Sequence, residues 1–271
     1  MSLVETNWLE KNLNNVKIID CSWHMPQTRR NGFEEYKKQH IPNSIFFDLD
    51  ENSKKDTKLP HMLVQEEDWN NIVSKMGINN TDKIVIYDNS DVISSCRLWF
   101  NLIYFGHNAK LVHVLNGGFQ KWLLEKKRVT DQVSATDNSN YKSLEKKELV
   151  KDKIMIDKNL DVQDFKLIDA RSKDRFYGKI PEPREGLRSG SIKNSFCIPF
   201  NTCLNEDRTF KKKSELEKIF KECLEDLNEK NIVFSCGSGV TACVLALAYS
   251  LINDKYLPCI YDGSWAEYGI I

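Results

Sequence analysis

The sequence predicts an α/β protein built from two tandem copies of one parallel-sheet unit. Two observations support this prediction. Short apolar runs alternate with helical stretches along the chain, and the same sequence blocks recur in the same order in both halves. Alternation of short strands with helices favours a doubly wound parallel sheet. Because ligands of such sheets bind beyond the carboxyl ends of the strands, functional residues are expected there.

The repeat fixes the predicted domain organisation. Four blocks of the first half have counterparts at nearly constant spacing in the second half: Asp20 with Asp169, Ile41 with Ile192, Asp88 with Cys236, and Gly117 with Gly263. We therefore predict an N-terminal domain over residues 1–129, a linker over 130–150 and a C-terminal domain over 151–271. The linker region is rich in Ser, Asn, Asp and Lys, which is typical of an exposed segment.

Apolar patterning predicts the individual elements of each copy. In the first half, strands are expected within 18–22 and 83–88, with helices over 33–39, 66–76 and 93–105. In the second half, the strands recur within 167–172 and 231–235. Residues 240–252, dominated by Ala, Leu and Val, predict a buried helix directly after the second of these strands.

The composition is that of a soluble globular chain with balanced charge. Hydrophobic residues make up 41% of the 271 residues and charged residues 29%. Lys and Arg together number 39, as do Asp and Glu, so neither nucleic acid nor an anionic membrane is expected as the main partner. The longest apolar stretch is too short to span a bilayer, and the first residues lack the pattern of a signal peptide.

The distribution of cysteines indicates reduced thiols, and one of the cysteines differs from the others in its sequence context. None of the eight lies in a CxxC pair or in a Cys/His cluster with zinc-ligand spacing. We therefore expect a reducing, cytoplasmic location and neither a metal nor an organic cofactor. Seven cysteines are expected to act as small buried hydrophobes. The eighth, Cys236, differs because of the loop in which it lies.

Cys236 lies between a predicted strand and a predicted helix. The residues that follow it are small and uncharged: Gly237, Ser238, Gly239, Val240 and Thr241. Unpaired backbone N–H groups converge at such a helix start and favour the thiolate, which is the nucleophilic form. The glycines allow the backbone to curl around the sulfur without a Cβ in the way. We predict that Cys236 is a nucleophile; the competing interpretation is a buried structural thiol.

The first half carries Asp88 at the position of Cys236, and the loop after it contains a second acid, Asp91. A carboxylate cannot accept a sulfur atom, and the second acid would repel anions. Only the second half is therefore expected to be catalytic. A phosphatase-like thiolate site would need an Arg six residues after the cysteine, where this chain has Ala242.

The chain resembles the two-domain rhodanese-type sulfurtransferases over nearly its whole length, from Ile19 to Gly269. The most specific element is the loop over 236–242. Family members that use thiosulfate carry Arg and Lys after the cysteine, whereas those that use 3-mercaptopyruvate carry the neutral Gly-Ser-Gly-Val-Thr version found here. The chemistry agrees, because a doubly charged oxyanion needs fixed cations and a monocarboxylate keto thiol needs fewer. The resemblance thus implies 3-mercaptopyruvate as the substrate.

The resemblance also implies supporting residues. Arg175 and Arg184 match two arginines that hold the substrate carboxylate and keto oxygens, a task that suits the planar donor fork of Arg. In the first half, Asp50 and His61 match segments that lie over the site, and they would couple with Ser238 to move protons. From the residues alone, the two arginines could equally anchor a loop, and His61 could be an exposed loop side chain.

The reaction implied by the resemblance is a double displacement through a Cys236 persulfide. It would release pyruvate and pass the sulfur to a thiol such as thioredoxin or a small thiol, or to cyanide. A thiosulfate:cyanide sulfurtransferase and a persulfide carrier without turnover remain as alternatives. Arg171, two residues after Asp169, is expected to be structural and to tie down its loop through an ion pair.

Overall fold

The computed structural model of the chain describes residues 2–271 and divides into two compact units. The first unit consists of the chain up to Lys54, Leu63–Lys146 and Glu206–Thr209. The second unit consists of Lys55–Met62, Lys147–Asn205 and Phe210–Ile271. Each unit therefore includes a short segment that belongs by sequence to the other half of the repeat.

The first unit is built on a parallel sheet with the strand order β1-β5-β4-β2-β3. Its strands are β1 (Leu3–Val4), β2 (Lys17–Asp20), β3 (Ser44–Phe46), β4 (Ile84–Tyr87) and β5 (Val112–Leu115). Its α-helices are α1 (Thr6–Lys11), α2 (Gly32–Lys38), α3 (Glu66–Lys75), α4 (Ser95–Tyr104) and α5 (Gly118–Leu124). Short 3₁₀ turns lie at Pro26–Thr28 and Ala109–Leu111.

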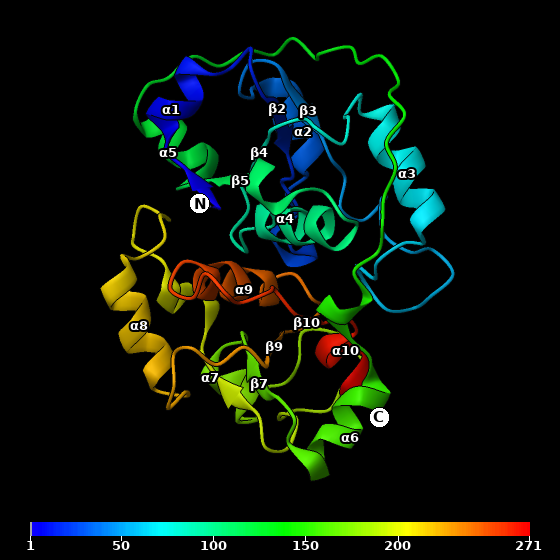
Figure 1. Cartoon of the computed structure of the whole chain (residues 1–271), viewed down its shortest axis with the longest axis vertical. Helices are drawn as coiled ribbons and strands as arrows, with labels where there is room; N and C mark the ends of the chain where they lie inside the picture. The colour runs from blue at the N-terminus through cyan, green and yellow to red at the C-terminus, as the bar shows by residue number, and fades with distance from the viewer. Residues whose placement is uncertain (1) are drawn as a thin grey trace. The chain divides into compact units, whose positions relative to one another are not determined.

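The second unit repeats this topology, with the order β6-β10-β9-β7-β8 in a second parallel sheet (Figure 1). Its strands are β6 (Val150–Lys151), β7 (Lys166–Asp169), β8 (Phe196–Cys197), β9 (Ile232–Ser235) and β10 (Ile260–Tyr261). Its α-helices are α6 (Lys153–Val162), α7 (Lys173–Phe176), α8 (Lys213–Lys221), α9 (Ala242–Ser250) and α10 (Ser264–Tyr268), with 3₁₀ turns at Lys147–Leu149 and Phe200–Cys203. The predicted tandem α/β fold is confirmed.

Helices cover both faces of each sheet, and the side chains of the central strand point alternately to one face and to the other. In β4, Val85 and Tyr87 join a core that includes Trp122 of α5, whereas Ile84 and Ile86 point to the opposite side, toward α4. The second unit repeats this division, because Val233 of β9 packs in one core with Trp265 of α10. The next residue, Phe234, meets Phe220 of α8 and Tyr249 of α9.

The predicted helices of the first half coincide closely with α2, α3 and α4. The helix expected from residue 240 begins only at Ala242, because Val240 and Thr241 complete the loop after Cys236. The segment expected as an exposed linker is mostly exposed but not detached. Thr130 exchanges backbone hydrogen bonds with His40, and the buried Tyr141 stacks on His107, so residues 130–146 pack on the first unit.

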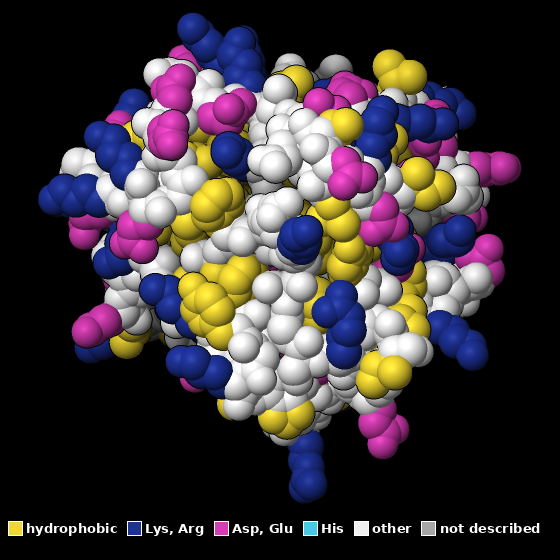
Figure 2. All heavy atoms as spheres, turned by 90° about the horizontal axis from the view of Figure 1, so that it is seen from below, with side chains coloured by type: hydrophobic (Ala, Val, Ile, Leu, Met, Phe, Trp, Pro, Cys, Tyr) yellow, Lys and Arg dark blue, Asp and Glu magenta, His cyan; other side chains and the backbone are white. Residues whose placement is uncertain are grey.

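The surface agrees with the balanced composition. Figure 2 shows one face of the molecule, on which Lys and Arg side chains are interspersed with Asp and Glu side chains. Among residues 2–271, the structure contains no helix long and apolar enough to cross a membrane. Over the same residues, no three His, Cys, Asp or Glu side chains come together as a metal site would require.

Candidate active site

Cys236 directly follows β9, and its thiol side is enclosed by a tight loop that leads into α9. Only 2% of the residue is exposed. Two carbonyl groups of the loop are tied to α10, since Trp265 N–H donates to Cys236 O and Ala266 N–H donates to Gly237 O, each at 2.9 Å. The loop is thus held to the strand on one side and to α10 on the other.

Ser264 completes this support from inside the loop. Its Oγ accepts hydrogen bonds from the N–H of Cys236 and of Gly239, both at 3.2 Å, and donates to Tyr261 O at 2.8 Å. Ser264 has φ 49°, a left-handed conformation that glycine adopts readily and serine does not. The hydroxyl is therefore held in a strained position in which it binds two loop N–H groups at once.

The repeat offers a direct comparison for Ser264. The first unit has a glycine there, Gly118, with φ 58°, and a Cβ on it would lie 2.6 Å from Asp88 O. The second unit thus carries a side chain where the first excludes one. Our sequence interpretation missed Ser264, although a serine at a position occupied by glycine in the sister copy was a signal that could have identified it.

Ser264 also determines which loop donors remain. The N–H of Gly239, predicted to help cradle the sulfur, is already paired with the Ser264 hydroxyl. Within residues 2–271, the structure assigns no protein acceptor to the N–H groups of Gly237, Ser238, Val240 and Thr241. These four N–H groups lie in the loop between Cys236 and α9, where they are available to a bound anion.

Arg175 and Arg184 converge on the loop, as predicted. A Cβ built on Gly237 would lie 3.2 Å from Nη2 of Arg175 and 3.8 Å from Nη1 of Arg184. Arg184 Nη2 also lies 3.5 Å from Ser238 Oγ. A side chain at position 237 would crowd the Arg175 guanidinium, so glycine there favours the close approach of Arg175 to the residue after Cys236.

The Arg175 side chain is oriented by a buried ion network. The Glu182 carboxylate, almost wholly buried, accepts from Arg175 Nη2 at 2.5 Å and from Arg171 Nη1 at 2.8 Å. Arg171 also binds Asp169 through two nitrogens and lies 4.3 Å from the ring centre of Trp265. Burial opposes the charge on Arg171, but Asp169 and Glu182 together raise its pKa. The predicted structural role of Arg171 is confirmed.

His61 reaches the same site from the segment Lys55–Met62, which belongs to the second unit. Its Nδ1 lies 3.0 Å from Ser238 Oγ, and only 4% of the residue is exposed. His61 has φ 60°, again in the left-handed region. The structure therefore brings together the predicted pair of His61 and Ser238, and it shows that His61 is not an exposed loop residue.

Asp50 lies in the first unit, shortly after β3. Its Oδ2 accepts a hydrogen bond of 2.8 Å from Trp23 Nε1. This contact holds the carboxylate beside the Trp23 indole. A role for Asp50 in proton transfer stays a prediction.

The corresponding loop of the first unit is occupied by its own side chain. Asp88 accepts from Ser90 N at 2.8 Å and from Ser95 N, at the start of α4, at 3.0 Å. Burial raises the pKa of Asp88, while the nearby Arg208 lowers it. Arg208 comes from the segment Glu206–Thr209, lies 3.9 Å from Asp88 and also contacts Ser90 O and Asp91. The first unit thus uses its helix-start donors internally.

A duplicated parallel-sheet protein in which one copy keeps a thiol at the strand end, with two arginines, a serine and a histidine beside it, has the arrangement of a cysteine-dependent group-transfer enzyme. Comparison with known proteins narrows this class. The family description "Rhodanese-like domain" matches residues 5–125 and 152–270. The chain belongs to this family, and its full-length relatives are sulfurtransferases.

Three relatives illustrate the similarity. Thiosulfate/3-mercaptopyruvate sulfurtransferase 1, mitochondrial, of Arabidopsis thaliana is 38% identical over 98% of this chain and 75% of its own length. The 3-mercaptopyruvate sulfurtransferase of Mus musculus is 34% identical over 98% and 91%. The crystal structure of SseA from Escherichia coli, a 3-mercaptopyruvate sulfotransferase with the rhodanese fold, superposes with a TM-score of 0.87 at 28% identity, covering 98% of this chain and all of SseA.

Proposed function

We propose that this sulfurtransferase takes its sulfur from 3-mercaptopyruvate and carries it as a persulfide on Cys236. The observation that supports this donor is the placement of charge. The loop after Cys236 carries no charged side chain, and the guanidinium groups of Arg175 and Arg184 lie against Gly237. An α-keto carboxylate offers oxygens that match the donor forks of two arginines.

In the first half-reaction, the Cys236 thiolate attacks the sulfur of 3-mercaptopyruvate. The new S–S bond forms as the C–S bond breaks, and its electron pair remains on the carbon as the enolate of pyruvate. Arg175 and Arg184 hold the carboxylate and keto oxygens while this negative charge develops. The proton from the substrate thiol passes to the enolate carbon, with Ser238 and His61 placed to relay it, and pyruvate leaves.

In the second half-reaction, a nucleophilic acceptor attacks the outer sulfur of the persulfide and the Cys236 thiolate is restored. A thiol of thioredoxin, a small thiol or cyanide can serve as this acceptor. The free N–H groups of Gly237, Ser238, Val240 and Thr241 supply hydrogen bonds to the anionic outer sulfur between the two steps. The scheme involves no metal or organic cofactor.

The central test is substitution of the nucleophile. Cys236→Ser is expected to abolish turnover, and wild-type protein incubated with 3-mercaptopyruvate without acceptor should gain the mass of one sulfur on the peptide that contains Cys236. Cys223→Ser is the matched control, because this half-buried cysteine lies in the same unit and has no role in the scheme. Turnover in Cys236→Ser would end the proposal.

The donor is tested separately. kcat/KM is expected to be higher for 3-mercaptopyruvate than for thiosulfate, since no fixed cation follows Cys236 in the loop. The relative from Arabidopsis thaliana carries both donors in its name, so thiosulfate is the specific alternative. A preference for thiosulfate would select it. A persulfide carrier would load sulfur but would not release sulfide continuously in the presence of excess reductant.

A cytoplasmic location belongs to the same proposal. Among residues 2–271, none of the eight cysteines forms a disulfide, and a persulfide enzyme needs its nucleophile as a thiol. Fractionation of cells, followed by detection of the protein in soluble and organellar fractions, tests this location.

A further inference from the structure

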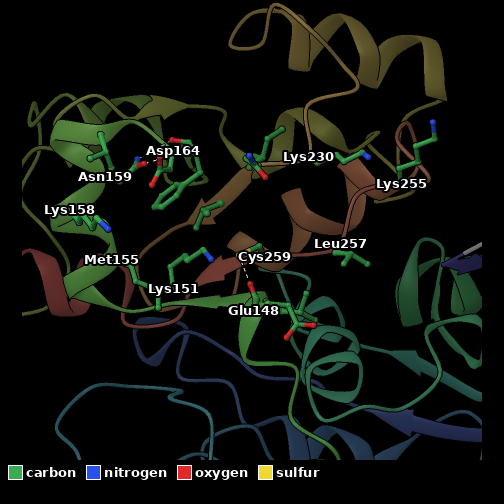
Figure 3. Close-up of a pocket in the computed structure, with 16 residues that line it drawn as sticks. Glu148, Lys151, Met155, Lys158, Asn159, Asp164, Lys230, Lys255, Leu257 and Cys259 are labelled. Atoms are coloured by element: carbon green, nitrogen blue, oxygen red, sulfur yellow. Dashed lines mark hydrogen bonds between the residues drawn. The ribbon is translucent and has the colours of Figure 1, made fainter.

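The second unit contains a cavity at the opposite end of its sheet from Cys236. The cavity has a volume of about 490 Å³ and lies where β6, β9 and β10 begin, beside α6. Ile232 and Val233, the first two residues of β9, form part of its wall, whereas Cys236 follows the last residue of that strand. In Figure 3, Lys151 and Cys259 lie near its centre, with Lys230 and Lys255 to one side and Lys158 and Met155 to the other.

The cavity carries an excess of positive charge. Four lysines line it, Lys151, Lys158, Lys230 and Lys255, against two acids, Glu148 and Asp164. Within residues 2–271, none of the four ammonium groups forms an ion pair with a carboxylate, whereas Lys37, Lys121 and Lys127 of the first unit do. An anion that entered the cavity would meet cations that are not already neutralised.

The same cavity exposes large apolar side chains. Met155, Val162 and Leu257 are 46%, 49% and 63% exposed, and all three lie on its wall. Below them the floor is buried and apolar, formed by Leu149, Ile232 and Val233. Exposed apolar side chains that gather around a hollow are typical of ligand sites, because a ligand removes their surface from water.

We propose that this cavity binds a small organic anion that has an apolar body and one or two negative charges. The apolar part would lie against Met155, Val162 and Leu257, and the charged group would lie among the lysines. The volume falls within the range of roughly 300–1,000 Å³ that small-molecule sites occupy, which favours such a ligand over a protein surface. Glu148 and Asp164 limit the net charge of the cavity, and this favours a ligand of low charge.

Cys259 lines the cavity but is not a second nucleophile. Burial raises the pKa of its thiol to about 12, and its Sγ donates toward Glu148 O at 3.6 Å. A neutral thiol adds polarisable apolar surface to the floor. The cavity therefore binds its ligand without covalent chemistry, and occupancy is independent of the sulfur transfer at Cys236.

The test uses the intact protein and the fluorescent anion 8-anilinonaphthalene-1-sulfonate. We expect saturable binding of one dye per chain, and binding at least tenfold weaker for the uncharged analogue N-phenyl-1-naphthylamine. The double variant Lys230→Ala/Lys255→Ala should weaken dye binding at least tenfold. Leu257→Asp, which adds a negative charge at an exposed position of the wall, should do the same.

The matched control is Lys193→Ala/Lys221→Ala, which removes the same charge from exposed positions of the second unit outside the cavity. It should bind the dye as the wild type does, and Cys236→Ser should also bind it unchanged. Equal weakening in the two lysine pairs, equal affinity for the charged and uncharged dyes, or displacement of the dye by 3-mercaptopyruvate would each overturn the proposal.

Discussion

Ser264 illustrates how a single hydroxyl can organise the loop that follows Cys236. It binds the N–H groups of Cys236 and Gly239, while four other N–H groups of the loop have no acceptor among the residues that the structure describes. Its left-handed backbone would be less strained with glycine, which the first unit has at the equivalent position, Gly118. Strain that persists at one copy of a repeat and not at the other indicates a functional reason for the side chain.

Ser264→Gly is expected to change the free energy of unfolding little while it lowers kcat strongly. Relief of backbone strain and loss of hydrogen bonds each amount to roughly 1 kcal/mol, so the free energy of unfolding should change by less than about 2 kcal/mol. The loop amides would then lose their alignment, and kcat should fall by about tenfold or more. Denaturant unfolding and steady-state kinetics measure the two effects. Ser264→Ala, which keeps the strain, should lose activity and more stability; full kcat in Ser264→Gly would contradict this role.

Asp20 and Asp169 occupy equivalent positions in the two units but have opposite surroundings. Asp169 is bound by the guanidinium of Arg171, whereas Asp20 accepts hydrogen bonds from uncharged groups, among them the N–H and hydroxyl of Ser22. Burial raises the pKa of Asp20 to about 7 from an ordinary value of 3.8. The folded protein therefore keeps this proton to a higher pH than the unfolded chain does.

This difference predicts a pH dependence of stability. Because Asp20 holds its proton more tightly when folded, its contribution is fully present below about pH 4 and is lost as the pH rises through about 7, by roughly 4 kcal/mol at most. Asp20→Asn should flatten this part of the profile, as followed by urea unfolding at pH 5 and pH 8. Asp169→Asn should instead destabilise at both pH values, because Arg171 loses one of its two carboxylate partners. An unchanged pH slope in Asp20→Asn would disprove the assignment.

At the scale of elements, the important feature is a loop segment that is not part of any helix or strand. Lys55–Met62 packs with the second unit and brings His61 to Ser238. His61→Asn tests a role of His61 in proton transfer, because Asn tolerates the left-handed backbone but its side chain does not titrate. We expect kcat to fall about 100-fold, with the melting temperature nearly unchanged. Activity close to wild type would remove His61 from the proton path.

Sequence periodicity predicted the regular elements well and the irregular ones poorly. The apolar run before Cys236 and the Ala-rich stretch after it predict β9 and α9 from local sequence alone. The equivalent strand and helix in the first half supported the same prediction. Arg171 was predictable because its partner Asp169 lies two residues away. Ser264 and the segment around His61 act through contacts distant in sequence, and no local pattern encodes those.

At the scale of the whole chain, a second segment packs outside its own half of the repeat. Glu206–Thr209 belongs to the first unit, where Arg208 meets the buried Asp88. Arg208→Ala should destabilise the protein by about 2 kcal/mol at pH 8, because Asp88 loses the cation that lowers its pKa. Adding Asp88→Asn should recover part of the loss. A double-mutant cycle measured by denaturant unfolding gives the coupling, and strict additivity would show that the two residues act independently.

The exchange of segments between the two units also limits which deletions of the chain would leave the site intact. A duplicated enzyme whose first copy has Asp88 in place of Cys236 could ordinarily lose that copy by deletion. Here the loss of the first half would remove Lys55–Met62, and with it the imidazole beside Ser238. Loss of residues within the second half would likewise take Arg208 away from Asp88. Because each copy depends on a short segment from the other half of the sequence, deletion of either half would remove residues that the remaining copy needs.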